Sequence, residues 1–184
     1  MRIIREKLEK ATDAQFKLLK KQIDSDPEAK RLLTTPMENI PQYKWLYHEL
    51  YNDLEKKYSI SVRKMSLLEL LQSLERLIIL MFSKAGSTFT GFLAYNEDGA
   101  EIKAIKTASF KDVKLRSNTV LASDLINFIE REIQRRTRIT WLAHKENKEV
   151  VDQYDTLLKA KKFNWSKATE EKLFWRYTIL NKGD

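Results

Sequence analysis

One stretch toward the C-terminal end of the chain brings together residue types that can do chemistry. It reads Ile139-Thr-Trp-Leu-Ala-His144, with Asn147 and Tyr154 after it. The apolar run predicts a buried strand, and Asn147 stands where a polar turn leads into the following helix. An Asn at this corner can cap the helix or hydrogen-bond a ligand, and a Tyr on the helix face can pack in the core or donate a proton.

The segment before that strand predicts another helix, at 120–136. Its apolar side chains recur at intervals typical of one helix face, and Ser117, Asn118 or Thr119 can cap its start. The backbone N–H groups at a helix start carry partial positive charge, so such an end can bind a phosphate. The strand–helix–strand order implies parallel neighbouring strands with a right-handed crossover.

The whole chain predicts an α+β fold, or mixed α/β, with a mixed and partly antiparallel sheet flanked by helices. Strands are expected at 2–8, 77–82, 88–95, 100–110, 138–143 and 173–180. Helices are expected after Thr12, after Asp26, and at 42–58, 65–74, 120–136 and 146–161. Asn96-Glu-Asp-Gly99 signals a hairpin turn, and an alternation that slips at Ala104-Ile105 predicts a β-bulge in the returning strand.

The length and composition fit a single domain over 1–184. Residues 13–74 are expected to form an enlarged helical insert after the first strand, and residues 76–180 the sheet with its crossover helices. A stripe of tyrosines at 42–58 is expected to pack in the core, although exposed tyrosines can also stack on bases.

Composition excludes several classes of function. The chain contains no Cys, which excludes disulfides, Cys-bound zinc and thiol catalysis. It has no apolar run of the ~20 residues that span a bilayer and no hydrophobic signal core, so a cytoplasmic protein without a membrane partner is expected. With two His and no acidic cluster, no metal site is expected. The net charge of +8 favours an anionic partner, either nucleic acid or a phosphate-rich ligand.

The order of elements from about Thr88 to Leu180 resembles the cofactor-binding half of the GNAT acyltransferase superfamily. In that family a Gln/Arg-x-x-Gly-x-Gly/Ala loop binds the pyrophosphate of acetyl-coenzyme A. The resemblance puts this loop at Ser117-Asn118-Thr119-Val120-Leu121-Ala122. Ala122 fits the last position, whereas Val120 replaces the first Gly and Ser117 replaces the Gln/Arg. Arg116 is adjacent and adds a positive charge.

The resemblance also assigns roles to two side chains, because family members carry Asn-x-x-Ala-x-x-x-Tyr at the start of the next helix. Asn147 would contact the pantetheine arm, and Tyr154 would protonate the leaving thiolate. With an oxyanion-stabilising N–H near the bulge, this implies an N-acyltransferase that uses acetyl-CoA as co-substrate. The insert at 13–74 would form the acceptor side, and the amine acceptor could be a small molecule, a protein or an RNA-linked amine.

Two other interpretations stay open, and so does the oligomeric state. Val120 is consistent with a GNAT-like scaffold that has lost catalysis. The second alternative is a basic nucleic-acid-binding module, which would use Arg131, Arg135, Arg136 and Arg138. No general base for an amine is evident, and His144 is expected to be a surface turn histidine.

Overall fold

The computed structural model describes residues 6–50, 61–110 and 118–182, with side chains at 8–48, 61–110 and 125–182. Seven strands form one sheet in the order β1-β2-β3-β4-β5-β7-β6. They are β1 (Glu6–Lys10), β2 (Ile79–Ala85), β3 (Thr88–Asp98), β4 (Glu101–Ser109), β5 (Arg138–His144), β6 (Asn164–Glu170) and β7 (Phe174–Leu180). β4 and β5 are parallel, whereas β1–β2, β5–β7 and β6–β7 are antiparallel. The α+β class predicted from the sequence is therefore confirmed.

The helices fall into an early group and a late pair. Between β1 and β2 lie α1 (Asp13–Ser25), α2 (Pro27–Thr34), η1 (Met37–Asn39), η2 (Pro41–Tyr43), α3 (Lys44–Leu50), η4 (Val62–Lys64) and α5 (Leu67–Leu77). The crossover from β4 to β5 contains α6 (Asn118–Glu132), and α7 (Lys148–Ala160) joins β5 to β6. Among the described residues, no helix is long and apolar enough to cross a bilayer.

The chain gathers into two compact units. The first comprises Met1–Ala94 and Lys106–Arg116, and the second comprises Tyr95–Ile105 and Ser117–Asp184. The β3–β4 hairpin contributes residues to both units, and its tip belongs to the second. The single domain that the sequence predicts over 1–184 stays a prediction.

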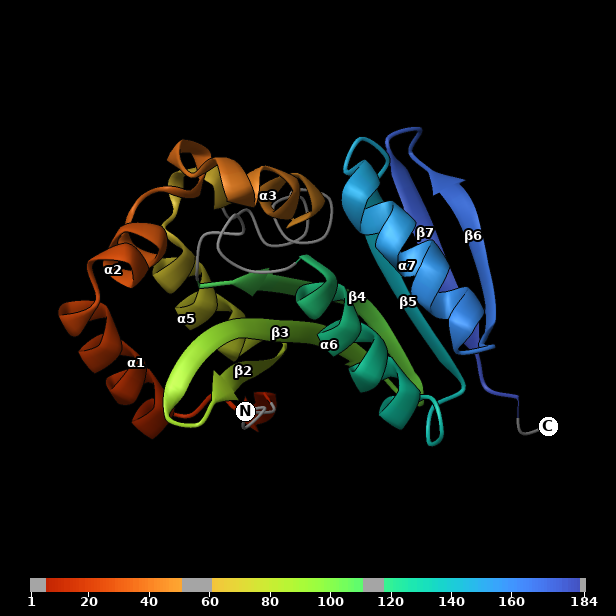
Figure 1. Cartoon of the computed structure of the whole chain (residues 1–184), viewed down its shortest axis with the longest axis horizontal. Helices are drawn as coiled ribbons and strands as arrows, with labels where there is room; N and C mark the ends of the chain where they lie inside the picture. Colours follow the sequence, from red (N-terminus) through yellow and green to blue (C-terminus); the bar gives the residue numbers. More distant parts are fainter. Residues whose placement is uncertain (1–5, 51–60, 111–117, 183–184) are drawn as a thin grey trace. The chain divides into compact units, whose positions relative to one another are not determined.

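In the first unit, helices cover β2 and the start of β3. α5 packs on β2, and α2 packs on both α1 and α5 (Figure 1). α1 buries the three residues that its spacing predicts, Phe16, Leu19 and Ile23. The rings of Phe16 and Phe82 meet edge-on with centroids 5.1 Å apart. Contacts of this kind contribute about 1 kcal/mol beyond the area they bury, so they fix α1 on the sheet.

Polar side chains bind these helices to the hairpin. The Gln22 amide accepts a hydrogen bond from the backbone N–H of Phe89 (2.8 Å) and donates one to its carbonyl (3.0 Å). The Tyr43 hydroxyl donates to the Ser109 carbonyl (3.3 Å), and burial raises the pKa of this phenol. At Gly91 the two strands lie so close that a Cβ atom would be 2.5 Å from the carbonyl oxygen of Ala108. β3 therefore requires glycine at this position.

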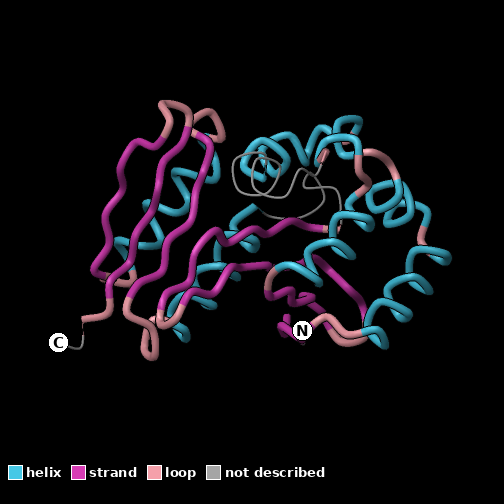
Figure 2. Tube along the Cα trace, turned by 180° about the vertical axis from the view of Figure 1, so that it is seen from behind, coloured by secondary structure: helices cyan, strands magenta, loops and turns pink. Residues whose placement is uncertain are grey.

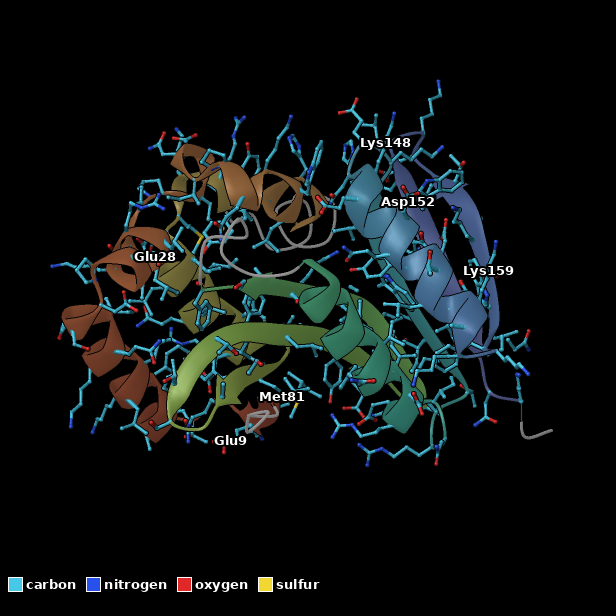
Figure 3. The ribbon with its side chains drawn as sticks, viewed as in Figure 1. Glu9, Glu28, Met81, Lys148, Asp152 and Lys159 are labelled. Atoms are coloured by element: carbon cyan, nitrogen blue, oxygen red, sulfur yellow. The ribbon has the colours of Figure 1, made fainter. Side chains whose placement is uncertain are left out.

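In the second unit, α7 covers one face of β5, β7 and β6. Figure 1 shows α7 in front of these strands, and Figure 2, seen from behind, shows the strands in front of α7. The outer face of α7 carries Lys148, Asp152 and Lys159 (Figure 3). Its inner face buries Val151, Tyr154 and Leu158. This division is the amphipathic pattern from which the sequence predicted a helix here.

An ion-pair network fixes the hairpin tip in the second unit. The guanidinium of Arg136 is 9% exposed and binds Glu97 on β3 and Glu132 on α6. Burial alone would raise the pKa of Glu132, but hydrogen bonds and charges from Arg135 and Arg136 outweigh it and lower that pKa. Arg138 at the start of β5 pairs with Glu101 of β4 at 2.8 Å. These contacts hold the start of β4 beside the start of β5.

Several sequence predictions need correction. β6 was not predicted, because its Asn-Trp-Ser-Lys-Ala-Thr-Glu sequence is polar and lies at the edge of the sheet. Leu77 ends α5 rather than starting a strand, and β3 continues to Asp98 through most of the expected hairpin turn. The helix expected at 42–58 is present as η2 and α3 up to Leu50, and its remainder lies outside the described residues.

The Arg136 network gives a pH-dependent prediction. Glu132→Gln removes a charged acceptor, and we expect it to lower the free energy of unfolding by about 2 kcal/mol at pH 7. Because the pKa of Glu132 is lower in the folded state than in the unfolded chain, this stabilisation is complete above about pH 5 and is lost as the pH falls. Urea unfolding of both proteins from pH 7 to pH 3 measures the difference.

Glu130→Gln is the matched control on the same helix. Glu130 pairs with Lys161 at 3.0 Å, but both side chains are more than 40% exposed, so its loss should cost well under 1 kcal/mol. Equal losses for the two variants, or a Glu132→Gln loss that persists at pH 3, would contradict the network.

Candidate active site

The backbone of β4 becomes irregular shortly after the two positions at which it is paired with β5. Glu101 pairs with Arg138 and Ile102 pairs with Ile139. Two residues further along β4, Ala104 has a left-handed backbone with φ 56°. A residue with a side chain adopts this conformation at a cost of about 1–2 kcal/mol. The positive φ of Ala104 shows an irregular backbone at the predicted place, and the β-bulge itself stays a prediction.

The start of α6 contains most of the residues predicted to bind pyrophosphate. The helix begins at Asn118 and runs for 15 residues, and its first backbone N–H groups have no acceptor within the helix. Its first turns contain Asn118, Thr119, Val120, Leu121 and Ala122. The side chains of these five residues lie outside the described part of the chain, and so do Arg116 and Ser117 altogether.

Asn147 occupies the N-cap position of α7 without capping it by its side chain. Its backbone has φ −80° and ψ 63°, and its carboxamide makes no capping hydrogen bond. Backbone hydrogen bonds hold Asn147 in the turn, since the Asn147 N–H donates to the His144 carbonyl (3.0 Å) and the Val151 N–H donates to the Asn147 carbonyl (3.1 Å). The geometry therefore does not support a role for this side chain as a helix cap.

Tyr154 belongs to an aromatic cluster that we define as Trp141, Tyr154, Trp165 and Tyr177. The Tyr154 side chain is only 8% exposed. Its ring meets Trp141 edge-on at 5.8 Å between centroids and Tyr177 edge-on at 5.5 Å. Trp141 and Tyr177 stack in parallel at 5.2 Å, and Trp165 stacks on Tyr177 at 6.2 Å. The cluster fixes the Tyr154 ring against Trp141 of β5.

The second tyrosine of the cluster has a structural hydrogen bond. The Tyr177 hydroxyl donates to the Asp155 carboxylate at 2.8 Å, and Lys167 of β6 pairs with the same carboxylate at 2.8 Å. Burial and the bond to Asp155 both raise the pKa of Tyr177 well above its usual value. This phenol therefore remains protonated and ties α7 to the sheet.

Two buried polar atoms of this unit have no hydrogen-bond partner in the part of the chain that the structure describes. They are the indole Nε1 of Trp141 and the Oε1 of Gln153. Trp141 is 1% exposed, so its N–H is removed from water as well. The sequence analysis placed Trp141 in a buried strand but assigned it no role.

The environment of His144 differs from the one that the sequence predicted. His144 is the last residue of β5 and is buried, not a surface turn residue. Its Nδ1 accepts a hydrogen bond from the Glu146 backbone N–H at 3.1 Å, and its ring meets Phe174 at 5.2 Å. An accepting Nδ1 fits the neutral imidazole, so His144 helps to shape the turn into α7.

Comparison of the whole chain with solved structures finds several proteins of similar fold. The chain is similar to spermidine N-acetyltransferase from Vibrio cholerae, solved with CoA and spermine, with a TM-score of 0.58, 11% identity, and 96% of this chain and 95% of that one covered. It is similar to the N-acetyltransferase PseH from Campylobacter jejuni, with a TM-score of 0.50, 13% identity, and coverage of 96% and 99%. The chain has the GNAT fold.

A third similar structure is a domain from Methanocaldococcus jannaschii, with a TM-score of 0.56, 12% identity, and coverage of 96% and 98%. No protein-family model matches the sequence, and no curated protein matches it. At these identities the comparison establishes the GNAT fold, and the fold confirms the resemblance found in the sequence.

Three of the four arginines of the nucleic-acid alternative are paired with carboxylates of this chain. Arg135 makes two hydrogen bonds to Glu132, at 2.7 and 2.9 Å. Arg136 binds Glu97 and Glu132, and Arg138 binds Glu101. Three of the four guanidiniums are thus already neutralised by carboxylates, which weakens the case for a basic binding surface here.

The uncapped geometry of Asn147 gives a direct prediction. Asn147→Ala should change the free energy of unfolding by less than about 0.5 kcal/mol, because no capping hydrogen bond is lost. Thr12→Ala is the matched control, since the Thr12 hydroxyl accepts from the Gln15 N–H at 3.2 Å, and it should cost about 1 kcal/mol. Chemical denaturation measures both. A loss at Asn147 as large as that at Thr12 would show that its side chain caps the helix after all.

Proposed function

We propose that this protein is an N-acyltransferase that transfers an acetyl group from acetyl-CoA to an amine. The observation that best supports the proposal is the packing of the buried Tyr154 phenol on Trp141 of β5. This contact fixes a possible proton donor against the strand that runs parallel to β4. The fold shared with two N-acetyltransferases, one of them solved with CoA and spermine, adds support.

The residues of the second unit suit an acyl-CoA ligand in three ways. The first turn of α6 offers backbone N–H groups for the pyrophosphate. The Asn147 carboxamide, which does not cap α7, can hydrogen-bond an amide of the pantetheine arm. The aromatic cluster would exclude water from one side of the bound ligand, and electrostatic interactions are stronger there than in water.

Bound acetyl-CoA supplies an activated acyl group on a thiolate leaving group. The chain would position this thioester and the amine so that the new C–N bond forms as the C–S bond breaks. Tyr154 would donate its hydroxyl proton to the departing sulfur, the amine would release its own proton to solvent, and solvent would return a proton to Tyr154. A backbone N–H near Ala104 would stabilise the negative charge that develops on the carbonyl oxygen.

The acceptor amine is the second substrate that the proposed reaction requires. The spermine bound by the Vibrio cholerae protein makes polyamines a reasonable first class to test. The basic surface charge of this chain, +8 overall, favours instead an amine that also carries acidic groups.

Ligand-induced stabilisation tests the proposal without knowledge of the acceptor. Acetyl-CoA at about 100 times its Kd should add about 2.7 kcal/mol of stability and raise the melting temperature. ATP is the matched control, because it is a nucleotide polyanion without a pantetheine arm. No shift at millimolar acetyl-CoA would contradict the proposal. An equal shift with ATP would favour a general anion-binding surface.

The two tyrosines of the aromatic cluster make a matched pair for the catalytic role. Tyr154→Phe should lower kcat by about 10²-fold or more and leave acetyl-CoA affinity nearly unchanged, because only a proton donor is lost. Tyr177→Phe should cost about 1–2 kcal/mol of stability through its bond to Asp155, and leave kcat unchanged. Thiol release from acetyl-CoA with a panel of amines measures turnover. Normal turnover in Tyr154→Phe would rule out this phenol as the acid.

A further inference from the structure

The indole N–H of Trp141 is a hydrogen-bond donor held in the interior without an acceptor. Its nitrogen is buried, and no described residue accepts from it. Buried indoles usually satisfy this N–H, because a donor removed from both water and protein acceptors is destabilising. A bound ligand can supply the partner that such a donor lacks.

The surroundings of Trp141 show which part of a ligand it can reach. Trp141 belongs to β5, which runs parallel to β4, and its ring meets that of Tyr154 edge-on at 5.8 Å between centroids. If Tyr154 protonates the sulfur of a thioester, the carbonyl oxygen of that thioester lies one bond beyond the carbon attached to the sulfur. An acceptor of the right kind would then lie within reach of the indole.

We propose that the Trp141 indole N–H donates a hydrogen bond to the thioester carbonyl oxygen of the bound acyl donor. This inference rests on the proposed function, and it gives Trp141 a binding role that Tyr154 does not have. The bond would orient the carbonyl group and draw electron density from its carbon, which assists attack by the amine.

The rigidity of the site suits this role. Trp141 stacks on Tyr177 with an angle of 8° between the ring planes, and Tyr177 is itself bonded to Asp155. A donor fixed in this way loses little conformational freedom when the ligand binds. The same contacts should keep the site intact in a variant that retains an aromatic ring at this position.

Comparison of two ligands isolates the proposed bond. CoA has the whole pantetheine arm of acetyl-CoA but lacks the thioester carbonyl. Trp141→Phe should therefore weaken acetyl-CoA binding about tenfold, measured by calorimetry, and leave the Kd for CoA within about twofold. Trp175→Phe removes an indole of β7 that lies outside the cluster and should leave both affinities unchanged. Equal weakening of both ligands by Trp141→Phe, or no weakening of either, would overturn the proposal.

Nuclear magnetic resonance of the wild-type protein provides a test that needs no folded variant. The four tryptophans give separate indole N–H signals, and that of Trp141 should move downfield with acetyl-CoA and move less with CoA. An unmoved signal at saturating acetyl-CoA would refute the bond.

The two hypotheses fail in different ways. If the wild-type protein binds no acetyl-CoA, the proposed function and this inference both fall. If it binds acetyl-CoA while Trp141→Phe retains full affinity for both ligands, only the role of Trp141 falls and the proposed function stands.

Discussion

In the β3–β4 hairpin, the backbone geometry at two positions disfavours a side chain, for a different reason at each position. At Gly91 the strands approach so closely that a single Cβ atom would overlap a backbone carbonyl. At Ala104 the returning strand instead adopts a left-handed conformation that a side chain disfavours. The first constraint belongs to the first unit and the second to the second unit. In the second unit, ion pairs of Arg136 and Arg138 hold the hairpin tip against α6 and β5, and these contacts offset the cost at Ala104.

The aromatic cluster in the second unit joins stability to the proposed chemistry. Tyr177 has its partner within the protein and fastens α7 to β6 and β7. Trp141 is equally buried, but its N–H has no acceptor among the described residues. A core built only for stability would satisfy both groups, since a buried unsatisfied donor destabilises a fold. The contrast between neighbouring rings is the physical reason to treat this cluster as part of a site.

Elements with a strong hydrophobic periodicity, and one irregular backbone position, could be predicted from the sequence, whereas an element with a weak pattern could not. The spacing of Phe16, Leu19 and Ile23 gave the correct buried face of α1, and the slipped alternation located Ala104. β6 was missed because an edge strand has only one paired side and can be polar. The burial of His144 and the unpaired N–H of Trp141 depend on tertiary neighbours, Phe174 and the cluster, which no local pattern contains.

The central claim is that the second unit binds an acyl-CoA through α6, Asn147 and the aromatic cluster. A crystal structure of the protein with acetyl-CoA tests it most directly. The account predicts density for the pyrophosphate at the start of α6, and for the thioester within hydrogen-bonding distance of the Trp141 Nε1 and the Tyr154 hydroxyl. A complex in which the ligand is well ordered elsewhere, with Trp141 and Tyr154 untouched, would contradict the account.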